Sequence, residues 1–336
     1  MHEASDALVH CQAIGQIPNE RSEQVTRALE GCLLCGGPLE GSENELFDTR
    51  FGLTGRYEVR RCLVCRLEQL YPVPEPGTLK ALYESHYNFG GETDTLYTRL
   101  RERFLFSFLN RLWSRLDGDI SFYLQRGTGR LLDIGCNEGR GLRIYAGNGF
   151  QAEGLELNET AASVARRAGF VVHTDLLENF NPKAPYDVAV LSNVLEHSVN
   201  PRRMLLDVGR VLTSGGRVWI SCPNSRSWLR AAFGRSWINW HVPFHISHFS
   251  PETLQKLLTE TGYVDVEVRQ ITPALWITQS IIACAFSKEG KKTRQLRNPF
   301  LTLLLMVLAR FVFFPALWAG NKLGHGDCLL ASGTKA

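Results

Sequence analysis

The chain has 336 residues, 44% of them hydrophobic and 21% charged, which suffices for one large α/β domain plus a smaller module and excludes disordered and fibrous classes. Its formal net charge of +3 creates no overall field that attracts nucleic acid, so a nucleic-acid partner is disfavoured. Residues 1–27 contain no apolar run long enough for a signal peptide. We expect them to form a tail on a cytoplasmic protein.

Four of the nine cysteines form two C-x-x-C pairs: Cys32 with Cys35, and Cys62 with Cys65. Two such knuckles supply the four ligands of a closed tetrahedral zinc site. Alternating residues within 51–61 predict a hairpin strand between the pairs. We expect residues 28–71 to form a zinc ribbon. Its zinc is expected to be structural, because four cysteine ligands leave no coordination position for water. Four reduced, buried thiols are the alternative.

The next segment, residues 72–126, is predicted to be a linker and a helical lid. Three prolines within residues 72–76 stiffen the chain and mark a boundary. Helical apolar spacing follows over 78–87 and 96–124, and the second helix has an apolar face of Leu100, Phe104, Phe108 and Leu112. This face either packs as an ordinary linker helix or covers a substrate.

A glycine-rich turn follows an apolar strand at residues 131–141. Gly135 and Gly139 permit a tight turn and close approach of a ligand. The order G-x-N-x-G-x-G differs from the dinucleotide fingerprint, and Glu138 inside the turn would repel a phosphate. The loop therefore favours a cofactor with an ammonium or sulfonium group.

Strands and helices then alternate to the end of the chain. Further strands are predicted at 149–156, 171–176, 186–193, 216–224, 264–268 and 327–332. This order predicts an α/β fold with a doubly wound, mostly parallel seven-stranded sheet. Glu156 and Asp175 lie where strands end at the ligand crevice, so they suit ribose hydroxyls and an adenine amine respectively.

The ordered motifs are Asp133 to Gly139, Leu195-Glu196-His197 and Pro223-Asn224. This set resembles class I S-adenosylmethionine-dependent methyltransferases of the branch with a D-x-G-x-G-x-G loop and an L-E-H segment. The resemblance covers residues 127–336, and fusion to a zinc ribbon is similar to an arrangement of bacterial methyltransferases that act on small molecules, including sugars. Asn137 replaces the middle glycine of the family, but asparagine tolerates the left-handed conformation.

The resemblance implies S-adenosylmethionine as cofactor. Its expected contacts are Asp133, Gly135, Asn137 and Gly139 around the methionine part, Glu156 and Leu157 at the ribose, Asp175 and Leu176 at the adenine, and Asn193 beside the sulfonium. Residues 193–197 also resemble the E-x-x-E-H segment with which some family members hold a divalent metal. Asn193 stands where the first glutamate would be, which disfavours a catalytic metal.

Methyl transfer to an alcohol or phenol requires alignment, exclusion of water and a base. His197 follows the fourth predicted strand, and His241, His245 and His248 lie among aromatic residues after the fifth. We predict an aromatic wall of the acceptor pocket with His245 or His248 as the base and His197 as a further candidate.

An apolar helical insertion is predicted at about 273–322. Its longer apolar stretch, 300–319, contains Arg310, which costs roughly 2.5 to 3.5 kcal/mol at a bilayer centre, and Pro315, which interrupts a helix. A transmembrane span is therefore disfavoured. Two alternatives stay open: helices packed on the domain or on a partner subunit of a homo-oligomer, and peripheral membrane contact through 274–319.

The sequence thus predicts methyl transfer from S-adenosylmethionine to an oxygen or carbon of a small-molecule acceptor, with a sugar or lipid-linked intermediate as an example. An RNA-base methyltransferase with a zinc-ribbon reader is one alternative. A non-catalytic scaffold that binds S-adenosylmethionine is another.

Overall fold

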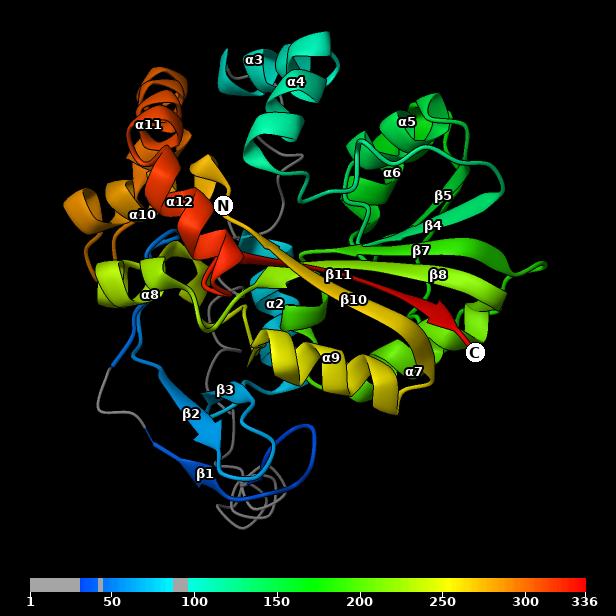
Figure 1. The fold of residues 1–336 in the computed structure, drawn as a ribbon, viewed down its shortest axis with the longest axis horizontal. Coiled ribbons are helices and arrows are strands. Elements are labelled where there is room, and N and C mark those ends of the chain that lie inside the picture. Colours follow the sequence, from blue (N-terminus) through cyan, green and yellow to red (C-terminus); the bar gives the residue numbers. More distant parts are fainter. Residues whose placement is uncertain (1–30, 42–44, 87–95) are drawn as a thin grey trace, which may run out of the picture.

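The computed structural model describes residues 31–41, 45–86 and 96–336. The expected tail, 1–27, lies outside these residues. The described chain forms a large twisted sheet with helices on both faces, a small sheet on one side of it, and a group of helices at one end (Figure 1).

The small sheet carries the cysteine knuckles. Its strands, in spatial order, are β1 (Leu39–Glu40), β2 (Glu58–Cys62), β3 (Glu68–Tyr71) and β9 (Ser247–His248), all antiparallel to their neighbours. The β2–β3 hairpin confirms the strand expected within 51–61. Strand β9 comes from far downstream and pairs Glu68 with His248. The sequence did not predict that the downstream region completes this sheet.

The large sheet has seven strands: β4 (Arg130–Ile134), β5 (Gln151–Leu155), β6 (Val172–His173), β7 (Tyr186–Ser192), β8 (Leu212–Pro223), β10 (Tyr263–Ile271) and β11 (Cys328–Lys335). Their spatial order is β10-β11-β8-β7-β4-β5-β6, and β11 alone runs antiparallel to both of its neighbours. The doubly wound, mostly parallel fold is therefore confirmed. The order reverses between β4 and β7, the point at which such sheets bind ligands beyond the carboxyl ends of their strands.

Helices cover both faces of this sheet. They are α5 (Arg140–Gly147) and α6 (Glu159–Arg167) on one face, and α7 (Pro201–Val211) and α9 (Pro251–Glu260) on the other (Figure 1). Alternate β4 residues face the two layers: Leu132 packs in the core with α7 and α9, whereas Leu131 packs with Tyr145 of α5. Ser250 and Thr253 form a capping box that starts α9.

Among the described residues, three helices precede the large sheet: α2 (Pro76–His86), α3 (Leu96–Leu105) and α4 (Phe108–Asp117). The single helix expected over 96–124 is wrong, because the chain breaks at 106–107 and α4 ends at Gly118, whose φ of 103° is incompatible with a helix. Of the two alternatives for its apolar face, packing as a linker helix is contradicted at α4, and covering a substrate stays a prediction. Phe108 is 76% exposed and Leu112 59% exposed.

The remaining helices gather at one end of the molecule: α8 (Trp228–Phe233), α10 (Ala274–Phe286), α11 (Pro299–Val312) and α12 (Phe314–Lys322). Short 3₁₀ turns are η2 (Leu195–His197), η3 (Gly234–Ser236), η4 (Ile238–Trp240) and η5 (Arg294–Arg297). Helices α11 and α12 meet at a 69° bend, and Pro315 lies in the first turn of α12. No single helix of the described chain is long and apolar enough to cross a bilayer; only the bent α11–α12 pair has sufficient length and composition.

Candidate functional site

The glycine-rich turn joins β4 to α5 at the carboxyl edge of the sheet. Gly135 has a φ of 72°, and a Cβ atom there would lie 2.8 Å from Val194 Cγ2. Gly139, with a φ of 77°, caps α5, and its Cβ would lie 2.6 Å from the Cβ of Ala165. Both positions therefore require glycine. Asn137 has a φ of 51°, the left-handed conformation that asparagine tolerates.

Glu156, directly after β5, holds this turn in place. One carboxylate oxygen accepts a hydrogen bond from the Asn137 amide at 2.9 Å, and the other accepts one from the Asn158 amide at 2.8 Å. A carboxylate has about four lone-pair sites, so both oxygens can accept a further bond from a ligand hydroxyl. Glu156 thus positions the loop as well as facing the crevice, a role that the sequence pattern did not reveal.

Asp133 lies at the centre of the same edge. Its side chain is buried, and no described residue donates a hydrogen bond to its carboxylate. Burial, assisted by the negative charge of Glu156, raises the pKa of Asp133 to about 8. A buried carboxylate that receives no hydrogen bond from the described residues and lies near a second carboxylate favours a ligand with a cationic group beside Asp133.

Glu138 does not play the electrostatic role expected from the sequence. Its carboxylate pairs with Arg140 at 2.5 Å, so the charge that was expected to repel phosphate is largely neutralised. Arg140 also pairs with Glu102 of α3 at 3.3 Å. The preference for a cationic ligand therefore rests on Asp133 and Glu156, and Arg140 connects the cofactor turn to the helices above it.

The other predicted cofactor contacts lie at the same edge of the sheet, after β5, β6 and β7. Leu157 is 61% exposed and Leu176 is 49% exposed, and Asp175 is also exposed. Asn193 has a φ of 55°, and its amide donates to the Ser221 carbonyl at 2.9 Å. Exposed apolar side chains at this position suit contact with a planar, partly apolar ligand.

His197 lies just beyond β7 in a buried cluster. Its Nδ1 is 2.7 Å from the Tyr83 hydroxyl oxygen and 3.0 Å from the Phe244 carbonyl oxygen. Because a carbonyl can only accept, Nδ1 carries the proton and Nε2 carries the lone pair. Burial lowers the pKa of His197 to about 4, so the ring is neutral at pH 7.

Glu196 and His245 lie beside His197. Neither carboxylate oxygen of Glu196 accepts a hydrogen bond from another described residue, and burial raises the pKa of Glu196 to about 8. His245 donates from Nδ1 to the Asn239 carbonyl at 2.8 Å, and its Nε2 is 3.9 Å from Glu196 Oε1. The ligand atoms of Glu196, His197 and His245 lie within 4.8 Å of one another, so this set could hold a metal ion.

The sequence analysis considered Glu196 and His197 as part of a metal-binding segment and disfavoured a metal because Asn193 replaces the first glutamate, but it did not foresee His245 as a third ligand. His245, the third member of the trio, comes from a different part of the chain than Glu196 and His197. No local spacing links His245 to Glu196. Only the contact between the turn after β7 and the segment after β8 brings them together.

The other two histidines lie deeper in the aromatic cluster. His241 packs on Phe244 at a ring distance of 5.1 Å and on Phe51 of the ribbon segment at 5.8 Å. His248 belongs to β9 of the small sheet and contacts Trp240. Burial lowers the pKa of His248 to about 3, which makes it a weak base.

Asp327, just before β11, anchors the aromatic segment. Its carboxylate accepts hydrogen bonds from Ser227 Oγ at 2.5 Å, Trp237 Nε1 at 2.8 Å and Asn239 Nδ2 at 3.1 Å. The segment after β8 is thereby fixed to the start of the antiparallel strand, so the histidines have a rigid frame. Tyr83, Phe51 and Asp327 all support the site, yet their sequence surroundings give no signal of this.

The four predicted zinc ligands converge in the small sheet. The Sγ atoms of Cys32 and Cys65 are 3.3 Å apart, those of Cys35 and Cys62 are 3.5 Å apart, and all four thiols lie within 4.8 Å of one another. Four thiolates at about 2.3 Å from a tetrahedral zinc are roughly 3.8 Å apart, close to the observed spacing. Backbone amides of Val64 and Cys65 donate to Cys62 Sγ at 3.4 Å. This donor set fits zinc.

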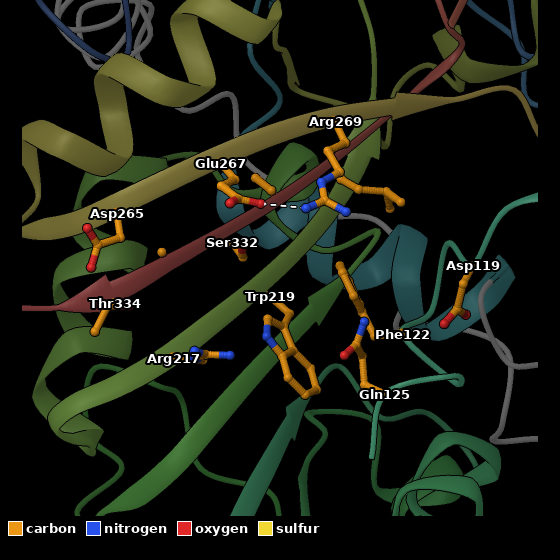
Figure 2. A pocket seen from close by; sticks show the side chains of 13 residues that line it. Asp119, Phe122, Gln125, Arg217, Trp219, Asp265, Glu267, Arg269, Ser332 and Thr334 are labelled. Carbon is orange, nitrogen blue, oxygen red and sulfur yellow. Dashed lines mark hydrogen bonds and ion pairs between the residues drawn. The ribbon is translucent and has the colours of Figure 1, made fainter. Parts of the chain in front are cut away.

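A cavity of about 390 Å³ lies elsewhere, on the face of the large sheet over β8, β10 and β11. Figure 2 shows Trp219, Phe122 and Asp119 on one side of it and the Glu267–Arg269 ion pair on the other. None of the predicted site residues lines this cavity. It is separate from the carboxyl edge, and the candidate site does not include it.

A family model described as a methyltransferase domain matches residues 97–268, just over half of the chain. A protein of Mycobacterium tuberculosis named as a probable S-adenosylmethionine-dependent methyltransferase is 31% identical over 139 residues, covering 40% of this chain and 49% of that protein. A ubiquinone biosynthesis O-methyltransferase of Yersinia pestis is 29% identical over 138 residues, covering 37% of this chain and 57% of that enzyme.

The chain therefore spans about half the length of the curated relatives it matches. Among solved structures, an S-adenosylmethionine-dependent methyltransferase of Thermotoga maritima is similar with a TM-score of 0.46 and 20% identity, over 77% of this chain and all of that one.

Proposed function

Since the chain belongs to the methyltransferase-domain family, we propose that it is a class I S-adenosylmethionine-dependent methyltransferase that methylates an oxygen or carbon atom of a small molecule. The observation that carries this proposal is the carboxylate pair at the sheet edge. Asp133 is buried and receives no hydrogen bond from the residues that the structure describes, and Glu156 retains lone pairs after fixing the glycine turn. The names of both curated relatives support methyl transfer, and that of the Yersinia enzyme supports transfer to oxygen.

The cofactor, when bound, supplies an electrophilic methyl group on a sulfonium. In our proposal Asp133 accepts from its ammonium group, Glu156 accepts from its ribose hydroxyls, and Asp175 with Leu176 borders its adenine. Gly135 and Gly139 let the backbone approach closely, since a Cβ atom at either position would already clash with the protein. Asn193, which directly follows β7, would border the reacting group.

We assign the proton-accepting role to His197 or His245. Both rings carry their proton on Nδ1 through a backbone carbonyl, so Nε2 can accept a proton from an acceptor hydroxyl. Both are neutral at pH 7 because burial lowers their pKa values. His248 is the weaker candidate, because its ring belongs to the small sheet. We propose a sugar or a lipid-linked intermediate as the methyl acceptor.

The test has two stages. Calorimetry with S-adenosylhomocysteine measures cofactor binding, and mass spectrometry of metabolite extracts incubated with methyl-labelled cofactor identifies the acceptor. We expect binding and a labelled small molecule. Absence of binding would refute the cofactor assignment, whereas binding without any labelled product would favour a scaffold. Label found only in added RNA would favour the RNA-base alternative.

We also propose that Cys32, Cys35, Cys62 and Cys65 hold a structural zinc. Elemental analysis is expected to show the loss of one zinc per chain in the double variant Cys32→Ser, Cys62→Ser, together with a lower melting temperature. Cys284→Ser is the matched control, because Cys284 is an exposed thiol on α10. Unchanged zinc content in the double variant would disprove the assignment.

A further inference from the structure

Helix α11 turns its apolar face towards solvent and its polar residues towards the protein. Its exposed residues are Phe300, Leu303, Leu304, Val307, Leu308, Phe311 and Val312, each between 39% and 68% exposed. They recur at the spacing of one helical face, a stripe that normally faces a protein core. Its buried residues are Thr302, Ala309 and Arg310. An ordinary surface helix shows the opposite arrangement.

Helix α4 has the same reversal. It exposes Phe108, Leu109, Leu112 and Leu116, whereas its buried residues are Asn110, Ser114 and Asp117. Exposed apolar side chains continue onto α12, where Trp318 is 57% exposed. Exposed apolar side chains in this number on α4, α11 and α12 indicate an interaction site rather than an ordinary solvated face. We call the exposed faces of α4, α11 and α12 the apolar surface.

A buried ion pair joins the two reversed helices. Arg310 of α11 lies 3.8 Å from Asp117 of α4 and donates to the Leu116 carbonyl. Asp117 also accepts from the Ala274 amide at 3.0 Å, which ties in the start of α10. The one charged residue of α11 thus points inward, so its outer stripe is uninterrupted. Arg310, which argues against a transmembrane span, does not argue against contact with a bilayer surface.

The charges on α4, α11, α12 and η5 that are exposed are basic, and Glu102 of the adjoining helix α3 pairs with Arg140. On α4, Arg111 and Arg115 are exposed one helical turn from Phe108 and Leu112. Arg294 is exposed in η5, which contacts the start of α11. Helices α11 and α12 and the turn η5 carry no acidic residue, and α4 carries only the buried Asp117. This charge pattern complements anionic lipid headgroups.

We propose that the apolar surface docks the protein onto an anionic membrane, with α11 and α12 lying in the interface. Helix α11 has 14 residues, about 21 Å of length, which is shorter than a bilayer core of about 30 Å. Its 69° bend with α12 also suits helices that lie on the surface. A second copy is a poorer partner, because a symmetric contact would bring together two surfaces that carry exposed arginines and no exposed acidic residue on α4, α11 or α12.

Flotation of the full-length protein with vesicles tests this docking without cofactor. We expect binding to vesicles that contain phosphatidylglycerol, weaker binding to pure phosphatidylcholine, and a decrease at high salt. The double variant Leu304→Gln, Phe311→Gln is expected to lower binding at least tenfold. Arg115→Glu with Arg294→Glu is expected to lower it at least fivefold, and only for the anionic vesicles.

Leu206→Gln on α7 is the matched control, because Leu206 is a 48% exposed leucine on another helix. It is expected to bind vesicles like the wild type, and circular dichroism confirms that each variant is folded. The proposal is overturned if the wild type does not float with anionic vesicles or if the double apolar variant floats equally well. A wild-type dimer that this variant dissociates, without any vesicle binding, would assign the surface to a second copy instead.

Discussion

The carboxyl edge of the large sheet, where Asp133 and Glu156 lie, is called the cofactor edge below. It buries polar groups, whereas the apolar surface exposes hydrophobic ones, and both arrangements are the reverse of the usual one. At the cofactor edge, Asp133 is a buried acid that accepts no hydrogen bond within the described part of the chain. On the apolar surface, Leu304 and Phe311 are apolar side chains largely exposed to water. Each region is unfavourable in isolation and becomes favourable with a partner of complementary chemistry. The kind of misplaced group therefore indicates the partner. A buried acid calls for a cation, and an exposed apolar face calls for an apolar phase.

The largest effect is expected from removing the buried polar contacts beneath the apolar surface. Asp117→Ala removes one member of the buried pair with Arg310 and the acceptor of the Ala274 amide. Leaving a buried arginine unpaired should cost about 3–5 kcal/mol of unfolding free energy in urea titrations. The control Glu260→Ala breaks only exposed ion pairs and should change stability by less than about 1 kcal/mol. Equal stabilities of the two variants would contradict the inward orientation of Asp117 and Arg310.

At the cofactor edge, removing a charge should weaken binding without weakening the fold. Asp133→Asn deletes the proposed acceptor for the ligand cation, so the Kd for S-adenosylhomocysteine is expected to rise roughly a hundredfold, about 2.7 kcal/mol. The variant should melt no lower than the wild type, because it removes a buried ionisable group. Asp265→Asn, in the cavity of Figure 2, should leave the Kd unchanged. A calorimetric Kd of wild-type magnitude for Asp133→Asn would remove Asp133 from the site.

The raised pKa of Asp133 predicts a pH dependence. Protonated Asp133 stabilises the ligand-free fold below the ordinary pKa of an aspartate, and this contribution is lost as pH rises through about 8. A cationic ligand requires the ionised form, so affinity should increase severalfold from about pH 7 to about pH 8 and then level off. Calorimetry across this range measures the effect. The dependence should vanish in Asp133→Asn, and its persistence there would assign it to another group.

The smallest expected effect is on the apolar surface itself. Leu304→Gln removes an exposed side chain, so we expect the unfolding free energy to change by no more than about 0.5 kcal/mol. The matched internal comparison is Leu254→Ala on α9, a fully buried leucine whose truncation should cost about 2–5 kcal/mol. Urea titrations measure both. A large loss in Leu304→Gln would show that the leucine packs within the protein.

Features set by local pattern were predictable from the sequence. Alternating strands and helices predicted the seven-stranded sheet, and Gly135, Asn137 and Gly139 predicted a turn with left-handed residues, which the structure contains. The cysteine spacing predicted knuckles whose thiols converge. In each of these cases the information lies within one turn or one repeat of the chain.

Features set by contacts between distant segments were not predictable. Glu196 and His245 meet only because η2 packs beside the segment after β8, and Glu102 reaches Arg140 only because α3 lies over the cofactor turn. The 3.6-residue period of α4 and α11 was visible, but periodicity identifies a helical face without telling whether that face turns inward. The structure shows that Asp117 and Arg310 occupy the inner side.

The β3–β9 pairing has a consequence for the order of synthesis. Strands β1 to β3 leave the ribosome early, but their fourth strand follows only after β8, and Leu70 then finds its acceptor in the Ile246 carbonyl. Until then β3 presents an open edge, the kind of edge that pairs with other chains. A shortened chain that begins at residue 72 would in turn leave β9 without a partner. The sheet of the cysteine segment can therefore be completed only after the chain beyond β8 has been synthesised.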